Sequence, residues 1–194
     1  MSRPTRITTD QILEAARELF FEKGYGVSTA EIAAAAGVSE GSIFKRFASK
    51  IVLFQQAMGI PPLDMEAECA PLLGKGDMRD NLVALTRRLL EFHRTMLPRA
   101  MLLWSNMGRD PIKMFKKHHR SPPREVIDAL AAYLRAEMDL GRLARKDPSV
   151  LARMITGAAH TFVFHELIGG GGFDDDADGY VRAVVDVLME GVRP

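Results

Sequence analysis

The chain has 194 residues, of which 47% are hydrophobic and 26% are charged, and its formal net charge is +1. This balance is typical of a soluble globular protein, and it excludes a protein that binds nucleic acid through bulk positive charge. No apolar run approaches the roughly 20 residues that span a bilayer, and the N-terminal MSRPTRITTD lacks the apolar core of a secretory signal, so we expect a cytoplasmic protein without membrane contact.

The first sixty residues predict short helices, each starting at a serine or threonine that can cap it. Thr8 is followed three residues later by Gln11, and Ser28 by Glu31, which is the spacing of a capping box. In most of these segments, apolar residues recur at helical spacing until a glycine or proline follows. The predicted helices cover Thr8–Gly24, Ser28–Gly37, Ser39–Phe47 and Ser49–Gly59.

The remainder of the chain predicts longer helices that are richer in methionine and separated by breakers containing proline or glycine. Strand-like alternation is almost absent. The predicted helices cover Asp64–Leu73, Met78–Leu97, Arg99–Met107, Pro111–His118, Pro123–Leu140, Pro148–Ile168 and Asp176–Glu190. We therefore predict an all-α fold, with a small domain at residues 1–60 and a larger helical domain at residues 61–194.

The second and third predicted helices have the pattern of a helix-turn-helix. Four alanines at positions 33–36 make the second helix slim where the third would cross it. Gly37 suits a turn with positive φ, and Ser39 can cap the third helix. Ile43 and Phe47 lie four residues apart, so they share one face and are expected to pack inward.

The opposite face of the third helix carries Glu40, Gly41, Ser42, Lys45 and Arg46, with Phe44 at its edge. A helix of this width fits the major groove of double-stranded DNA. Gly41 and Ser42 would allow close approach, while Lys45 and Arg46 could reach phosphates or guanine edges. The same pattern also fits a plain helical hairpin whose basic residues face solvent. The residues alone leave both interpretations open.

The segment Ile12–Lys50, ILEAARELFFEKGYGVSTAEIAAAAGVSEGSIFKRFASK, resembles the N-terminal domain of the TetR family of bacterial transcriptional regulators. The resemblance lies in the "A..LF...G" of the first helix, the "ST.EIA..AGVS.G" through the turn, and the aromatic residue before "SK". Two positions depart from the family pattern. Phe44 stands where most members have tyrosine, and Ile51 stands where an acidic residue is usual.

The resemblance implies a homodimer that binds a palindromic operator with its two recognition helices. The predicted DNA-binding residues include two on the N-terminal arm and others along the helix-turn-helix. They are Arg3, Arg6, Ser28, Thr29, Ser39, Glu40, Gly41, Ser42, Phe44, Lys45, Arg46 and Lys50.

Apolar and aromatic residues crowd the middle of the chain, and the resemblance implies that this part binds a small-molecule effector. Methionine and aromatic side chains would suit an apolar or aromatic effector, although apolar residues at helical spacing also fit an ordinary core. The candidate pocket residues are Phe92, Met96, Met101, Trp104, Met107, Phe115, His160 and Phe162.

The last two long helices, Pro148–Ile168 and Asp176–Glu190, carry enough apolar surface to form a four-helix bundle between two copies of the chain. Packing of both helices within one copy is the alternative. With the resemblance, the dimer is the expectation.

The sequence thus predicts a ligand-responsive DNA-binding regulator, a repressor by family default, and not an enzyme. "HEL" at His165 lacks the second histidine of a zinc protease helix, and "GGGGFDDDAD" lacks the GK[ST] of a phosphate loop, so we expect no metal and no cofactor. The alternative is a helical small-molecule-binding protein, or an enzyme, with a vestigial helix-turn-helix.

Overall fold

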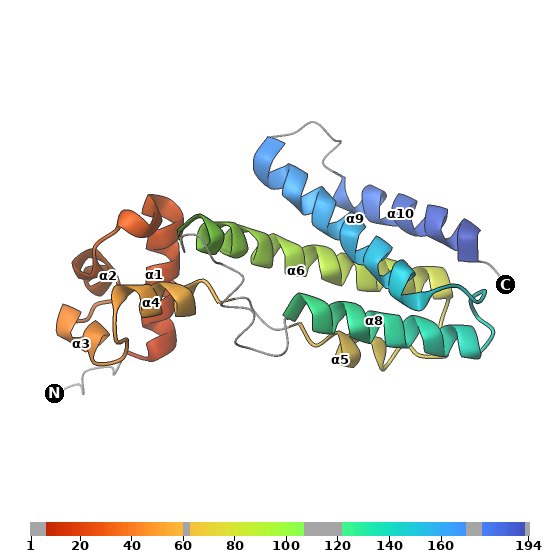
Figure 1. The fold of residues 1–194 in the computed structure, drawn as a ribbon, viewed down its shortest axis with the longest axis horizontal. Coiled ribbons are helices and arrows are strands. Elements are labelled where there is room, and N and C mark those ends of the chain that lie inside the picture. The colour runs from red at the N-terminus through yellow and green to blue at the C-terminus, as the bar shows by residue number, and fades with distance from the viewer. Residues whose placement is uncertain (1–6, 60–62, 107–121, 170–175, 193–194) are drawn as a thin grey trace. The chain divides into compact units, whose positions relative to one another are not determined.

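The computed structural model describes residues 7–59, 63–106, 122–169 and 176–192, and every regular element within these ranges is a helix (Figure 1). The described residues fall into two compact units. The first contains residues 7–59 and 99–106, and the second contains residues 63–98, 122–169 and 176–192. None of the described helices is long and apolar enough to cross a membrane.

The first unit contains the four predicted short helices and a single 3₁₀ turn. Both capping boxes are present: Gln11 N donates to Thr8 Oγ1 while Thr8 N donates to the Gln11 side chain, and Ser28 and Glu31 repeat the arrangement. The sequence prediction of these helix starts is confirmed. The elements are α1 (Thr9–Lys23), η1 (Gly24–Gly26), α2 (Thr29–Ala35), α3 (Glu40–Phe44) and α4 (Lys50–Ala57).

Aromatic side chains form the centre of the first unit. Phe20 packs edge-on against Phe54 with ring centroids 4.8 Å apart, and Tyr25 packs edge-on against the same ring at 4.9 Å. Ile43 and Phe47 are completely or almost completely buried, as the sequence predicts. Helix α3 nevertheless ends at Phe44, because the following backbone tightens into a turn in which Arg46 N donates to Ile43 O.

The described part of the second unit contains the short α5 and four longer helices, of which α6 continues into the first unit. Its α6 is one uninterrupted helix, so the predicted separate helices Met78–Leu97 and Arg99–Met107 are wrong. Pro98 lies inside α6, although proline in a helix interior is usually disruptive. The predicted segment Pro111–His118 lies outside the described residues. The elements are α5 (Met65–Cys69), α6 (Met78–Asn106), α8 (Pro122–Asp139), α9 (Pro148–Gly169) and α10 (Ala177–Val192).

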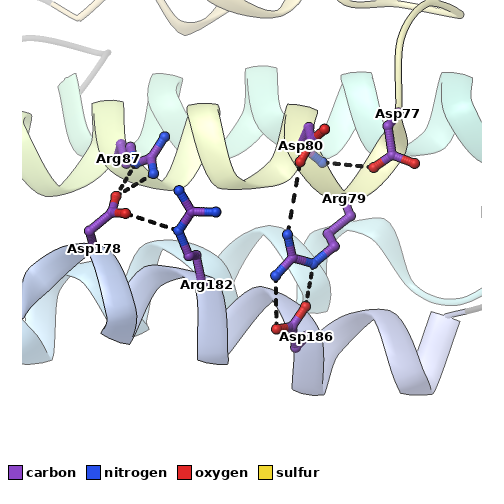
Figure 2. Close-up of polar contacts among 7 residues, drawn as sticks. All are labelled: Asp77, Arg79, Asp80, Arg87, Asp178, Arg182 and Asp186. Carbon is purple, nitrogen blue, oxygen red and sulfur yellow. Dashed lines mark hydrogen bonds and ion pairs between the residues drawn. The ribbon is translucent and has the colours of Figure 1, made fainter.

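Ion pairs fix the register between α6 and α10 (Figure 2). Arg79 makes a bidentate contact with Asp186 at 2.5 and 2.9 Å, and Arg87 pairs with Asp178, which also accepts from Arg182 at 2.9 Å. The arginines of α6 and the aspartates of α10 are each eight residues apart, in opposite order. The two helices therefore run antiparallel, although solvent screens these exposed pairs and each stabilises the fold only weakly.

A buried carboxylate holds the loop between α5 and α6. The Glu137 side chain is fully buried, and Gly74 N donates to its Oε1 at 3.0 Å. Arg142 Nε lies 2.8 Å from Glu137 Oε2, as an ion pair rather than a well-directed hydrogen bond. Arg142 also donates to the carbonyls of Lys75 and Gly76. The charged pair thus secures the start of α6, the longest described helix.

Candidate nucleic-acid interface

The turn between α2 and α3 is closed by backbone hydrogen bonds. Val38 N donates to Ala33 O at 2.9 Å, and Gly37 N donates to Ala34 O at 3.2 Å. Gly37 has φ of +66°, a region that favours glycine, which confirms its predicted role. A Cβ atom at Gly37 would also lie 3.3 Å from Ile7 Cδ1. The backbone conformation of the turn therefore favours glycine, and a larger residue would also push against the Ile7 side chain.

Polar side chains in the first turn of α3 are engaged within the helix-turn-helix itself. Ser39 Oγ accepts from Ser42 N at 3.2 Å and shares a hydrogen bond with Ser42 Oγ at 2.9 Å. Glu40 accepts a hydrogen bond from the hydroxyl of Thr29, at the start of α2. These contacts cap α3 and tie it to α2, so they hold the outward face in position.

Three basic residues lie after the end of α3, and their side chains differ in the contacts that they make. Lys45 is exposed and makes no ion pair with any residue that the structure describes. Arg46 donates to Ile7 O at 3.0 Å. Lys50 donates to Tyr25 O at 2.6 Å, and its ammonium lies 4.6 Å from the centre of the Tyr25 ring. An ammonium has three donors, so Lys50 retains hydrogen-bonding capacity at a fixed place.

Phe44 is the exposed apolar residue of α3, with 48% of its surface accessible to solvent. Exposed single hydrophobic residues are common and by themselves need no explanation. This one, however, lies on a helix whose other outward residues are Glu40 and the small Gly41 and Ser42, and the basic Lys45 follows directly. The surface formed by Gly41, Ser42, Phe44 and Lys45 therefore has the width, the charge and the small residues that entry into a major groove requires.

Two family models match the chain. Residues 12–57 match the bacterial regulatory proteins of the tetR family, and residues 81–191, more than half of the chain, match the C-terminal domain of AefR-like transcriptional repressors. The chain belongs to the TetR family. Its helix-turn-helix is accordingly the DNA-binding part of a transcriptional regulator.

Solved structures of TetR-family fold cover nearly the whole chain. A TetR-family transcriptional regulator from Mesorhizobium loti is 22% identical, with a TM-score of 0.76 and coverage of 95% of this chain and 96% of that one. A regulator from Saccharomonospora viridis, solved with choline, is 20% identical with a TM-score of 0.67 (95% and 97%). The fatty acid degradation regulator FadR from Bacillus halodurans is 20% identical with a TM-score of 0.64 (96% and 97%). No curated protein sequence matches.

The TetR-family fold brings ten of the predicted DNA-binding residues together on α2, α3, the start of α4 and the caps of these helices. None of the ten is buried, and the remaining two, Arg3 and Arg6, lie outside the described residues. Lys50 differs from the prediction in one respect, because its ammonium already has a carbonyl and a ring as partners. The individual DNA contacts stay predictions.

Sequence reasoning missed the residues that hold Lys50 and the C-terminal end of α4 in place beside this TetR-family interface. Tyr25 positions Lys50, as described above. Arg17 Nε donates to Ala57 O at 2.9 Å, and Arg99, from α6, donates to Gly59 O at 3.0 Å. Both guanidiniums thus satisfy carbonyls at the C-terminal end of α4, where cations are favoured. No local sequence pattern marks these contacts, because the partners are 40 residues apart.

The predicted pocket residues are dispersed. Phe92 and Met96 are buried on α6, and Phe162 is buried on α9, while Met101 and Trp104 are exposed on the part of α6 that belongs to the first unit. His160 is exposed, but its ring packs edge-on against that of buried His93 with centroids 5.4 Å apart. Met107 and Phe115 lie outside the described residues.

The Ser28–Glu31 capping box predicts how the start of α2 responds to acid. Hydrogen bonds from Ser28 to the Glu31 carboxylate, and its 3.0 Å ion pair with Lys23, lower the pKa of Glu31 to about 2. A lowered folded-state pKa means that this stabilisation is complete above the unfolded value near 4.5 and is lost as the pH falls toward 2. Glu31→Gln should therefore lower the melting temperature at pH 6, with a difference that shrinks toward zero near pH 2.

Thermal unfolding followed by circular dichroism across this pH range measures the effect. Glu66→Gln, an exposed carboxylate in the first turn of α5, is the matched control and should not reproduce the pH dependence. A Glu31→Gln difference that stays constant from pH 6 to pH 2 would contradict the assigned role.

Proposed function

We propose that the chain is a repressor that binds a palindromic operator as a homodimer, in the cytoplasm, and leaves it when a small apolar or aromatic effector binds. The observation that carries the DNA-binding half is the docking of α3 through buried Ile43 and through Phe47 just beyond the helix. This docking leaves Gly41, Phe44 and Lys45 exposed. Family membership supports the same conclusion. The proposal adds operator symmetry, dimerisation and a response to an effector to this DNA-binding function.

Dimerisation is supported by an exposed stripe along α9. Positions 150, 154, 157, 161, 164 and 168 alternate in steps of four and three, which is the spacing of a helix–helix seam, and all six are exposed. The stripe includes Val150, Met154, Phe164 and Ile168, and the small Gly157 at its middle allows close helix approach. A single copy of the chain leaves this apolar surface in water, and a second copy would cover it.

Helix α10 also exposes an apolar residue to solvent. Val187 is 70% exposed, whereas Val181 and Val185 on the opposite side of the helix are buried within the second unit. A helix that is apolar on two sides has one face left for a partner. In the proposed dimer, the exposed faces of α9 and α10 from two copies would pack together as a four-helix bundle.

An effector site is supported by apolar side chains around a neutral histidine. His93 is buried, and burial, with the nearby His160, lowers its pKa. Its Nδ1 lies 2.7 Å from Leu89 O, which can only accept, so Nδ1 carries the proton and Nε2 is left as an acceptor. Phe92, next in sequence, is also buried. This environment suits an apolar effector with one hydrogen-bond donor.

The proposed route from effector to operator follows the continuous α6. This helix carries Phe92, His93 and Met96, and further along it Arg99 binds the carbonyl of Gly59 at the end of α4. Helix α4 begins at Lys50, directly after the turn that follows α3. A shift of α6 on effector binding would thus act on α4 and then on α3. An effector produces such a shift only if its affinity differs between the two arrangements.

Lys45→Ala tests the DNA-binding face. Loss of one phosphate or base contact should weaken duplex binding and reduce the slope of log affinity against log salt by about 1 per subunit. Fluorescence anisotropy with a labelled duplex at several salt concentrations measures both quantities. Arg145→Ala, a similarly exposed cation in the second unit, should leave the slope unchanged. Equal slopes for wild type and Lys45→Ala would exclude this face and favour a vestigial helix-turn-helix.

Val187→Glu tests the dimer. Burying an unpaired carboxylate in an apolar seam is strongly unfavourable, so the variant should sediment as a monomer and bind operator at least tenfold more weakly. Ala132→Glu, which adds the same charge to an exposed position of α8, should remain dimeric. If Val187→Glu sediments like wild type, the α10 face does not form the interface.

Trp104, the single tryptophan, reports changes along α6, the helix that also carries Phe92 and His93 of the proposed effector site. Long-chain fatty acids and aromatic compounds, with choline as a polar comparison, should be titrated while its emission is followed. We expect one apolar class to change the emission and to lower operator affinity roughly 5- to 150-fold, the usual range of coupling between sites. Operator affinity that no compound of either class alters would overturn the effector half of the proposal.

A further inference from the structure

The charged residues that join α6 to α10 follow a regular spacing (Figure 2). On α10, Asp178, Arg182 and Asp186 follow one another in steps of four, so they lie along one side of the helix. On α6, Arg79 and Arg87 are eight residues apart. Arg79 pairs with Asp186 and Arg87 pairs with Asp178. Arg182 therefore lies between the two interhelical contacts, where it donates to Asp178 at 2.9 Å.

The residue of α6 at the level of Arg182 is apolar. Val83 lies midway between Arg79 and Arg87, and its side chain is buried. In the observed register, both arginines thus face carboxylates of α10, and Arg182 lies level with a valine. Arg182 and Arg87 lower the pKa of Asp178, so the carboxylate that they share is ionised at neutral pH.

A slide of α6 along α10 by one helical turn would bring like charges together. One turn is about 5.4 Å long and moves each side chain about four residues along the neighbouring helix. Because the helices are antiparallel, a slide in one direction places Arg79 opposite Arg182, and a slide in the other places Arg87 opposite Arg182. Both observed ion pairs break in either slide, and only the second slide brings Arg79 to a new carboxylate, Glu190. Attraction thus favours the observed register, and repulsion disfavours both neighbouring registers.

We propose that these five charged residues form a register lock, which makes α6 and α10 move as one body. The ion pairs are exposed and individually weak, but the lock does not depend on their strength alone, because Arg182 makes the alternative registers unfavourable. A movement of α6 would then carry α10 with it, together with Val187 of the proposed dimer face. An effector bound in one copy would thereby act on the other copy. This last consequence rests on the proposed function, whereas the lock itself does not.

Variants at position 182 test the repulsive part of the lock. Arg182→Glu gives α10 carboxylates at positions 178, 182, 186 and 190, so an arginine of α6 finds an acidic partner in either slipped register. Arg182→Lys keeps the positive charge and is the matched control. Arg182→Ala removes the repulsion without adding a carboxylate, so it should act in the same direction as Arg182→Glu but less strongly.

A distance between α6 and α10 reports the register directly. Spin labels can be attached to cysteines at Thr95 of α6 and Ala183 of α10, which are both exposed, in a chain whose single native thiol is removed by Cys69→Ala. Ala183 lies beside Arg182, whereas Thr95 is eight residues beyond Arg87, so the two labels are offset along the helices and a slide changes their separation. Labelled chains are diluted with unlabelled chains, so that double electron–electron resonance measures the distance within one copy.

Wild type and Arg182→Lys should each give one narrow distance. Arg182→Glu should add populations displaced by several ångströms, because a slipped register differs by one turn of about 5.4 Å. Circular dichroism should show the same helix content for all variants, since position 182 is exposed. A single narrow distance for Arg182→Glu and Arg182→Ala, as in wild type, would overturn the lock.

Operator affinity tests the link to the proposed function separately. Helix α6 also carries Arg99, whose hydrogen bond to Gly59 O holds the end of α4, so a slipped α6 should weaken operator binding. We expect a loss of about fivefold for Arg182→Glu, at the lower end of usual coupling between sites. Arg145→Glu, the same charge change between α8 and α9, should leave the affinity unchanged. If the distances split while operator affinity stays the same, the lock stands and its link to operator binding is overturned.

Discussion

The burial of Ile43 and Phe47 is the interaction on which the DNA-binding surface depends. Helix α3 has only five residues, and an isolated helix of this length is unstable in water. Ile43 of this helix, and Phe47 three residues after its end, are removed from solvent in a core that includes Phe20 and Phe54. Because one face of α3 is held so firmly, Gly41 and Phe44 on the opposite face, and Lys45 directly after the helix, can remain exposed.

The polar contacts of the first unit add precision to this arrangement. Ser39 caps α3, Thr29 ties it to α2 through Glu40, and Gly37 sets the turn between the two helices. On the other side, Tyr25 fixes Lys50 at the start of α4. These contacts place side chains before DNA arrives, so less conformational entropy is lost on binding. They also explain why so few polar groups of α3 remain free for base recognition.

Local rules predict the first unit well because its structure is determined by neighbours in sequence. The capping boxes at Thr8 and Ser28, the glycine at position 37 and the four-residue spacing of Ile43 and Phe47 all act over short distances. All are readable from the chain, as is the all-helical fold. TetR-family membership was accessible too, since the motif residues lie in one continuous segment.

Features that depend on tertiary contact could not be predicted. Pro98 signals a helix end by itself, yet α6 passes through it, and no sequence pattern links Arg99 to Gly59 or Lys50 to Tyr25. The individual DNA contacts, the domain limits at residue 60 and the pocket residues stay predictions. The candidate pocket residues in particular are far apart in sequence, and the described ones are dispersed along α6 and α9.

Selection of bound sequences from a random duplex pool, with the stoichiometry of the selected complex measured by sedimentation, tests the central claim most directly. Two α3 helices related by a two-fold axis should select a palindrome whose half-site centres are one helical turn, about 34 Å, or a multiple of it apart. Two copies of the chain should bind each duplex. A pool that yields no enriched sequence, or an asymmetric site bound by one copy, would contradict the account.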